Sequence, residues 1–165
     1  MAAEALAEPP AASYIYPAGG QRGTKVSFRV GGMFLYDQAP LEMLGPGVAA
    51  SGIIKRTETT WFEGPLIRQP ASQAAENYPK DYVGDVQIAA DAALGFRRWR
   101  VWNAQGVTPL VRFVIGDLPE VVENELEGEP IPVSVTLPVT INGRIFPRED
   151  VDVWTFEAAA GQSIT

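Results

Sequence analysis

The sequence predicts an all-β fold, an antiparallel β-sandwich, on three observations. Apolar and polar residues alternate with a period of two along several short stretches, which is the side-chain period of a strand. Turn-forming residues separate these stretches, since the chain holds 16 glycines and 14 prolines among 165 residues. Apolar residues make up 46% of the chain and charged residues 20%, a composition typical of a folded core. Short strands separated by turn signals favour a sandwich.

The clearest strand pattern covers residues 25–30, where Val26, Phe28 and Val30 share one face. The glycine pairs at 19–20 and 31–32 are interpreted as turns that open and close this strand. Other stretches alternate less cleanly or are shorter. In chain order they are residues 48–54, 86–88, 98–104, 110–115, 133–137 and 151–156.

Residues 98–104 have two different faces. Trp99 and Val101 lie on the apolar face, and Arg98, Arg100 and Trp102 lie on the other. A hairpin-like turn at 105–106 follows. The next strand then has its own apolar face, formed by Val111, Phe113 and Ile115.

The formal charge of −7 comes mostly from one short segment. Residues 117–130 carry six acidic residues and no basic one, whereas residues 14–116 carry eight acidic and eleven basic residues. Arg97, Arg98 and Arg100 form the basic cluster, which we interpret as the solvated face of a strand. A nucleic-acid surface requires a broader basic face with supporting motifs, so we expect no nucleic-acid partner.

These patterns divide the chain into four segments. Residues 1–13 are predicted to be a flexible stub, and residues 14–116 have the length of an Ig-like sandwich. Residues 117–130 are predicted to be an acidic linker extended by self-repulsion. Residues 131–165 carry strand patterns but are too few to fold alone, so we expect the first strands of a second sandwich and a fragment of a longer protein.

Cysteine and histidine are both absent. This excludes disulfides, thiol catalysis, imidazole triads and zinc sites built from these residues. The serines lie in no nucleophile elbow, and the acidic residues form no assembled pair. We therefore predict that the chain is not an enzyme. No apolar run approaches the length of a membrane span, and residues 1–13 lack the apolar core of a secretory signal.

The long irregular stretch between residues 61 and 82 supplies the candidate binding residues. Trp61, Phe62, Tyr78 and Tyr82 are aromatic residues of a kind that forms sugar-stacking or protein-docking surfaces on loops. The alternative is that these side chains pack the loop down onto the sandwich, because a loop of this length needs anchoring.

Asp150 and Asp152 are the candidate metal ligands, because residues two apart on a strand share a face. Calcium takes six to eight oxygen ligands, so it is the metal ion that these oxygens could help to hold, although we expect no cofactor. The alternative is that both acids are solvated at the entry to a strand.

Residues 16–35 carry a proline, a Gly-rich turn, Gly23-Thr24, an alternating strand, and glycines before Met33. This block resembles the opening of the IPT/TIG family of Ig-like domains, and residues 91–116 resemble the closing hairpin of that family. The resemblance covers about 100 residues and implies an Ig-like fold. The stretch from 61 to 82 is longer than the loops of that family.

Residues 139–164 contain Asp150-x-Asp152-x-Trp154-x-Phe156, followed by Ala-Gly-Gln at 160–162. This pattern resembles the start of a bacterial pre-peptidase C-terminal domain, a jelly-roll-like sandwich. The two modules together resemble large secreted or envelope proteins of planctomycete-type bacteria, in which such modules are appended domains.

The sequence therefore predicts a non-catalytic structural or adhesive module of a secreted or cell-surface bacterial protein. The alternative is an accessory domain that binds carbohydrate or peptide and is attached to a secreted hydrolase such as a peptidase. The expected partners are other domains of the same polypeptide and protein or carbohydrate ligands, with no membrane insertion. The identity of the ligand and the activity of the parent protein do not follow from the sequence.

Overall fold

The computed structural model describes residues 8–61, 67–68, 79–123, 131–144 and 151–164. Every regular element in these ranges is a β-strand, which confirms the predicted all-β class. Of the stub predicted at residues 1–13, residues 1–7 lie outside the described residues. Its last three residues, 11–13, belong to a strand.

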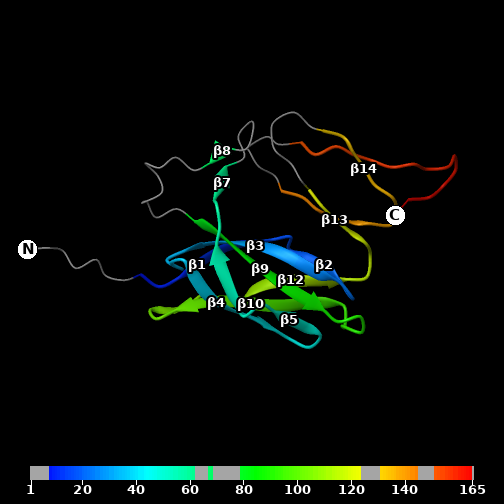
Figure 1. Ribbon diagram of the computed structural model, residues 1–165. Coiled ribbons are helices and arrows are strands. Elements are labelled where there is room, and N and C mark those ends of the chain that lie inside the picture. Colours follow the sequence, from blue (N-terminus) through cyan, green and yellow to red (C-terminus); the bar gives the residue numbers. More distant parts are fainter. Residues whose placement is uncertain (1–7, 62–66, 69–78, 124–130, 145–150, 165) are drawn as a thin grey trace, which may run out of the picture.

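Ten strands form one continuous sheet that folds over into two facing layers (Figure 1). The hydrogen-bonded order is β1-β3-β9-β6-β4-β10-β12-β2, with β5 beside β9 and β11 beside β10. The first layer consists of β1 (Ala11–Tyr16), β3 (Lys25–Met33), β9 (Lys80–Ile88), β6 (Ile53–Arg56) and β5 (Val48–Ala50). The second consists of β4 (Gln38–Leu44), β10 (Gly95–Asn103), β11 (Gly106–Val107), β12 (Val111–Gly116) and β2 (Gly19–Gln21).

Strand β4 connects the two layers, and the sequence patterns did not predict it. Residues 38–40 pair with β6 in the first layer, and residues 41–44 pair with β10 in the second. Pro40, which cannot donate to a ladder, lies where the strand changes partners. A proline inside a strand pattern argues for an edge or an irregularity, and here it marks the passage between layers.

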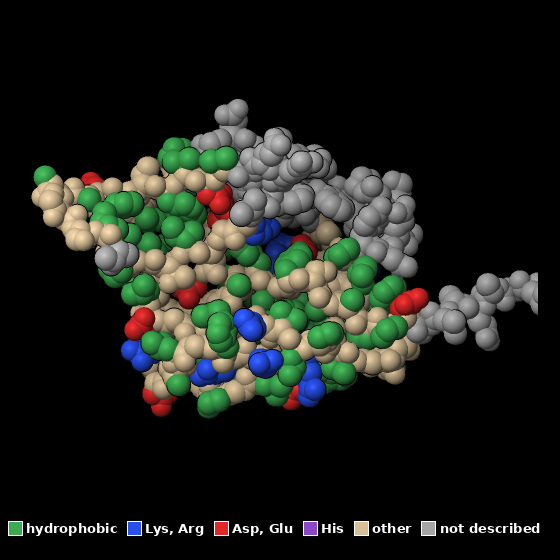
Figure 2. Space-filling model, turned by 180° about the vertical axis from the view of Figure 1, so that it is seen from behind, with side chains coloured by type: hydrophobic (Ala, Val, Ile, Leu, Met, Phe, Trp, Pro, Cys, Tyr) green, Lys and Arg blue, Asp and Glu red, His purple; other side chains and the backbone are tan. Residues whose placement is uncertain are grey.

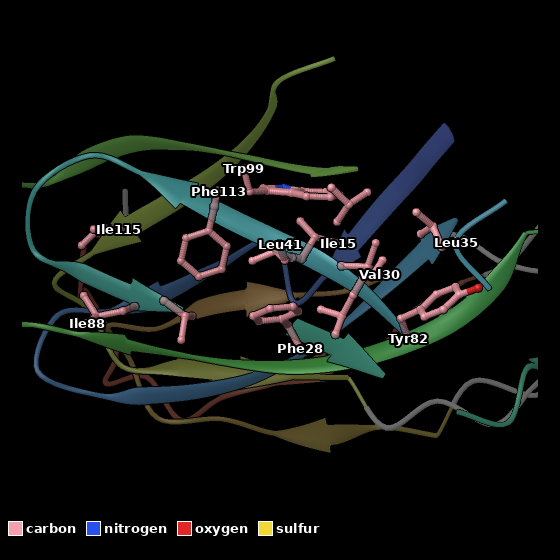
Figure 3. Close-up of a cluster of buried hydrophobic side chains, with 14 of the residues drawn as sticks. Ile15, Phe28, Val30, Leu35, Leu41, Tyr82, Ile88, Trp99, Phe113 and Ile115 are labelled. Carbon is pink, nitrogen blue, oxygen red and sulfur yellow. The ribbon is translucent and has the colours of Figure 1, made fainter. Parts of the chain in front are cut away.

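The core lies between the layers (Figure 3). Strand alternation sends Trp99 and Phe113 inward from the second layer and Phe28 and Tyr82 inward from the first, and all four are 0–2% exposed. Burying a side chain of this size stabilises the fold by about 1.5–3 kcal/mol. The remaining core side chains are aliphatic and come from the same strands. The whole core cluster falls between Ile15 and Ile115.

The glycine pairs predicted to be turns lie inside strands instead. Residues 19–20 belong to β2, which runs parallel to β12 with Gly19 opposite Val114. A Cβ at Gly19 would lie 2.6 Å from the carbonyl oxygen of Val114, so only glycine permits this approach. The segment from β1 to β2 thus passes from the first layer to the second.

Residues 31–32 belong to β3 and pair with both β1 and β9. A Cβ at Gly31 would collide with the Tyr14 ring, so that ring covers the glycine. The ring position lets the Tyr14 hydroxyl donate a hydrogen bond to the Asp81 carboxylate. Arg29 donates to the same carboxylate over 2.8 Å. Burial and the Asp81 carboxylate raise the pKa of the Tyr14 hydroxyl, which therefore remains a donor at neutral pH.

The C-terminal part of the chain forms two short parallel pairs. Strands β13 (Glu120–Val122) and β15 (Thr140–Asn142) make one, and β14 (Val133–Ser134) and β16 (Trp154–Thr155) make the other. Another small pair, β7 (Thr60–Trp61) and β8 (Ile67–Arg68), extends from the first layer. The predicted strand at 151–156 is thus limited to its residues 154–155.

The Tyr16 side chain joins the first of these pairs to the sandwich. Its hydroxyl lies 2.9 Å from the carbonyl oxygen of Glu123 and 3.0 Å from that of Asn142. The guanidinium of Arg144 lies over its ring, 4.6 Å from the centroid. The start of the predicted linker is therefore a strand beside the sandwich, while residues 124–130 lie outside the described residues. The boundary at residue 116 stays a prediction.

Two phenylalanines on paired strands test the inward and outward assignment. Phe113→Ala removes a side chain that is 0% exposed, so we expect the free energy of unfolding to fall by about 3–5 kcal/mol. Phe96→Ala removes one that is 61% exposed, so we expect a change below about 1 kcal/mol. Urea denaturation of both variants measures the difference. Similar losses in the two variants would contradict the register.

The contact between Gly31 and Tyr14 predicts non-additive substitutions. Gly31→Ala must displace the ring and so break its hydrogen bond to Asp81, and Tyr14→Phe breaks the same bond directly. Each single variant should lose roughly 1–3 kcal/mol, because a hydrogen bond to a charged group is lost. The Tyr14→Ala background should make Gly31→Ala nearly neutral in a thermal or urea melt. An equal cost of Gly31→Ala in both backgrounds would show that the ring does not lie over the glycine.

The location of the core predicts that residues 8–118 fold by themselves. This truncation keeps every residue of the core cluster and loses the contacts of Tyr16 with residues 123 and 142. We expect one cooperative thermal transition, and a near-ultraviolet circular dichroism spectrum that keeps the signal of ordered aromatic side chains such as Trp99 and Phe113. A truncated chain that shows no cooperative transition would place the boundary elsewhere.

Candidate functional site

The aromatic residues predicted to form a binding surface are not brought together by the described part of the chain. The structure corrects the assignment of Tyr82, which lies in β9, is 1% exposed and donates a hydrogen bond to the carbonyl oxygen of Tyr36 over 2.7 Å. It packs in the core because alternation in β9 points it inward. Trp61 ends β7, and Phe62 and Tyr78 lie outside the described residues.

The predicted calcium ligands are described only in part. Asp152 is exposed and Asp150 lies outside the described residues. Within the ranges that the structure describes, no group of three acidic residues could hold a metal ion. The calcium assignment stays a prediction. In the same ranges no helix is long and apolar enough to cross a membrane.

A different surface gathers charged and apolar side chains, on the outer side of the second layer. Alternation along β10 places Arg98, Arg100 and Trp102 on the outer face of the strand and Trp99 and Val101 on its inner face, as the sequence predicted. Strands β12 and β4 flank β10, and their outward side chains lie next to those of β10 on the same surface. We call this surface the arginine face and define it by Glu42, Phe96, Arg98, Arg100, Arg112 and Val114.

Strand register fixes how the side chains of the arginine face are ordered. Phe96 lies opposite Val114, and Arg98 lies opposite Arg112 on the neighbouring strand. Side chains directly opposite each other in an antiparallel pair have Cβ atoms roughly 5 Å apart. The Arg112 guanidinium lies over the Phe96 ring, 5.0 Å from its centroid. An exposed apolar pair thus sits directly beside a pair of arginines.

The third arginine of the face has a carboxylate partner. Arg100 Nε donates a hydrogen bond of 2.8 Å to Glu42 Oε2, and Arg100 Nη2 lies 2.7 Å from the same oxygen as an ion pair. The two side chains are 39% and 38% exposed, so this pair contributes little to stability. Its effect is to hold one carboxylate at a fixed place on the face. The face therefore carries three guanidinium groups and one carboxylate, in a chain whose formal charge is −7.

The structure removes Arg97 from the predicted basic cluster of Arg97, Arg98 and Arg100 and adds Arg112 to it. Arg97 points inward and is 6% exposed. Its Nε donates to the carbonyl oxygen of Pro46 over 2.8 Å and its Nη2 to that of Ala93 over 2.8 Å, so it ties together two turns. Arg112 takes its place on the surface. The alternation at residues 110–115 already put Arg112 on the outer side, but only the pairing of β10 with β12 shows which arginine it faces.

Figure 2 shows Lys and Arg side chains gathered between hydrophobic side chains on the lower half of the molecule. Phe96 is 61% exposed and Val114 is 41% exposed, and both Arg98 and Arg112 are exposed. A surface that presents apolar groups and guanidinium groups together has the composition of a recognition surface.

A small cleft lies elsewhere, between β2, the start of β3 and β13. It has a volume of about 290 Å³, and its lining includes Gly20, Lys25 and Glu120. Burial raises the pKa of the Glu120 carboxyl, and a hydrogen bond of 2.7 Å from Asn142 opposes this shift. Among the described residues that line the cleft, Glu120 is the acidic one.

Comparison with protein-family models finds no match, and comparison with curated proteins finds none. The resemblances to the IPT/TIG and pre-peptidase C-terminal families therefore stay predictions. Among solved structures, the SrpA adhesin from Streptococcus sanguinis aligns with a TM-score of 0.36 and 18% identity, over 66% of this chain and 56% of the adhesin. A point mutant of the same adhesin aligns with a TM-score of 0.35 and 16% identity, over 66% of this chain and 58% of that one. The chain spans little more than half the length of these all-β proteins.

Proposed function

We propose that the chain is a non-catalytic adhesive module of a secreted or cell-surface bacterial protein, and that it binds its ligand through the arginine face. The observation that carries the proposal is the exposed Arg98–Arg112 pair beside the exposed Phe96–Val114 pair. Guanidinium groups supply directed hydrogen bonds and charge, and the apolar pair supplies area that a ligand can cover.

The side chains of this face suit binding better than chemistry. Arginine stays protonated in proteins, so it cannot accept a proton from a substrate. The carboxylate of Glu42 is engaged twice by Arg100, and the sequence holds no histidine or cysteine that could serve as a base or nucleophile.

The sandwich gives this surface a rigid support. Each outward residue of β10 alternates with a core residue that is 0–6% exposed, since Arg97, Trp99 and Val101 point inward. The arginine face is thus preorganised by the core, which lowers the entropy lost on binding. An accessory domain of a secreted hydrolase would use the same surface, and would differ in what the rest of the polypeptide does.

Adhesion of the intact chain to immobilised glycans and extracellular proteins tests the proposal. Protein-coated beads should adhere to at least one surface of such a panel. The Arg98→Ala/Arg112→Ala double variant should reduce the adhering fraction by about tenfold or more, because two charged hydrogen-bond donors are lost.

The matched control is Lys25→Ala/Lys55→Ala. Both lysines are exposed on the first layer, so this variant loses the same charge and keeps the arginine face. It should adhere like the unaltered chain. Equal loss of adhesion in both variants, or no adhesion by the unaltered chain to any surface, would overturn the proposal.

A further inference from the structure

The Arg98–Arg112 pair lacks an anionic partner in the ranges that the structure describes. Neither side chain forms an ion pair there, although Arg100 on the same strand does. Like charges directly opposite each other on neighbouring strands destabilise a sheet. An anionic group placed between the two guanidinium groups would remove this repulsion and receive several charge-assisted hydrogen bonds.

Glu42 restricts what kind of anionic ligand fits. Its Oε2 accepts a hydrogen bond from Arg100 Nε and forms an ion pair with Arg100 Nη2, and its Oε1 has no hydrogen-bond partner among the described residues. Glu42 lies opposite Arg100, and Arg98 is two residues away on β10, about 7 Å along the strand. A ligand that covers the arginines therefore meets a carboxylate that accepts hydrogen bonds and repels acids.

An acidic peptide and an acidic sugar differ in the hydrogen-bond donors that they can offer to Glu42. A run of acidic side chains has no donor to offer to Glu42 except its backbone, and its charges are repelled. A sugar that carries an acidic group offers hydroxyl donors beside it, and these can bond to the free carboxylate oxygen. The Phe96 and Val114 side chains next to the arginines supply apolar area for the C–H face of a sugar ring.

We propose that the arginine face binds an acidic oligosaccharide, one that carries carboxylate or sulfate groups beside free hydroxyls. The Arg98–Arg112 pair holds the acidic group, Glu42 accepts hydrogen bonds from hydroxyls, and Phe96 packs against the ring. This inference rests on the proposed adhesive function and adds the class of ligand.

Binding of the intact chain to four probes tests the ligand class. The probes are dextran sulfate, which is sulfated and holds no carboxylate, oligogalacturonate, which is carboxylated, dextran, which is neutral, and poly-glutamate, which is an acidic peptide. Calorimetry should show binding of at least one acidic saccharide, weaker binding of poly-glutamate and none of dextran. Whichever acidic saccharide binds identifies sulfate or carboxylate as the acidic group.

Single substitutions then locate the binding. Arg98→Ala and Arg112→Ala should each weaken saccharide binding by about tenfold or more. The affinity of Arg98→Lys should lie between those of Arg98→Ala and the unaltered chain, because lysine keeps the positive charge but lacks the paired N–H donors of the guanidinium group. Lys25→Ala should leave the affinity unchanged. The chain is acidic as a whole, so general electrostatic attraction does not favour polyanions.

Glu42→Ala separates a saccharide ligand from a peptide ligand. Removing this carboxylate raises the positive charge of the face for every probe, so the informative quantity is the ratio of saccharide affinity to poly-glutamate affinity. That ratio should fall at least severalfold, because only the saccharide loses a hydrogen-bond acceptor. Thermal melts of all variants confirm that they are folded.

The outcomes distinguish this inference from the proposed function. Poly-glutamate or dextran binding as tightly as the acidic saccharides would overturn the inference, and so would unchanged saccharide binding by both arginine variants. If the arginine face binds an extracellular protein in the adhesion panel and no acidic saccharide, the adhesive function stands and the ligand class is wrong. If no surface of the panel and no probe binds, both proposals fail.

Discussion

The register of β10 between β4 and β12 is the constraint on which the rest of the structure depends. This strand sends Trp99 and Val101 into the core and Arg98 and Arg100 to the surface. A shift by one residue would exchange the two sets and expose Trp99, the largest fully buried side chain among the described residues. The pairing with β12 also decides that Arg98 faces Arg112. Stability and the composition of the arginine face are therefore consequences of one alignment.

The C-terminal residues depend on that sandwich and do not resemble it. Their strands are two or three residues long and pair in parallel, an arrangement that is stable mainly where both faces are covered. Several of their apolar side chains are exposed, and Ile131 reaches 76% and Val151 59%. The hydrogen bonds of Tyr16 with residues 123 and 142 connect this part to the core.

Alternation alone predicted the strands whose inner faces are filled with large apolar residues. Residues 25–30 and 110–115 are examples, because Phe28 and Phe113 each anchor a clean period of two. Strand β4 has Ala39, Leu41 and Met43 in the same period of two, but Pro40 argued against a strand at this place, so β4 was not predicted. The glycines at 19–20 and 31–32 were assigned to turns because glycine usually favours them. Here the neighbouring backbone or an aromatic ring comes too close for any side chain.

The site was less predictable than the fold. A single strand shows which residues share a face, so Arg98 and Arg100 were found on one outer surface. The partner across the ladder is a property of pairing, which is why Arg112 was missed and Arg97 was wrongly grouped with them. Tyr82 follows a long irregular stretch in sequence, and only the start of β9 at Lys80 shows that it belongs to the core.

The parallel pair of β2 and β12 affects how the sandwich would respond to mechanical force. β2 follows β1 in the chain, and β12 is the last strand of the second layer in the chain. A force that pulls the chain before β2 away from the chain after β12 therefore acts along the axes of both strands. The bonds from Val114 to Ala18 and from Arg22 to Gly116, at 3.0 and 2.9 Å, are then loaded in shear and at the same time. They must break together, not one after another as in a peeled hairpin. Stretching of the sandwich between β2 and β12 is therefore resisted by this pair of strands.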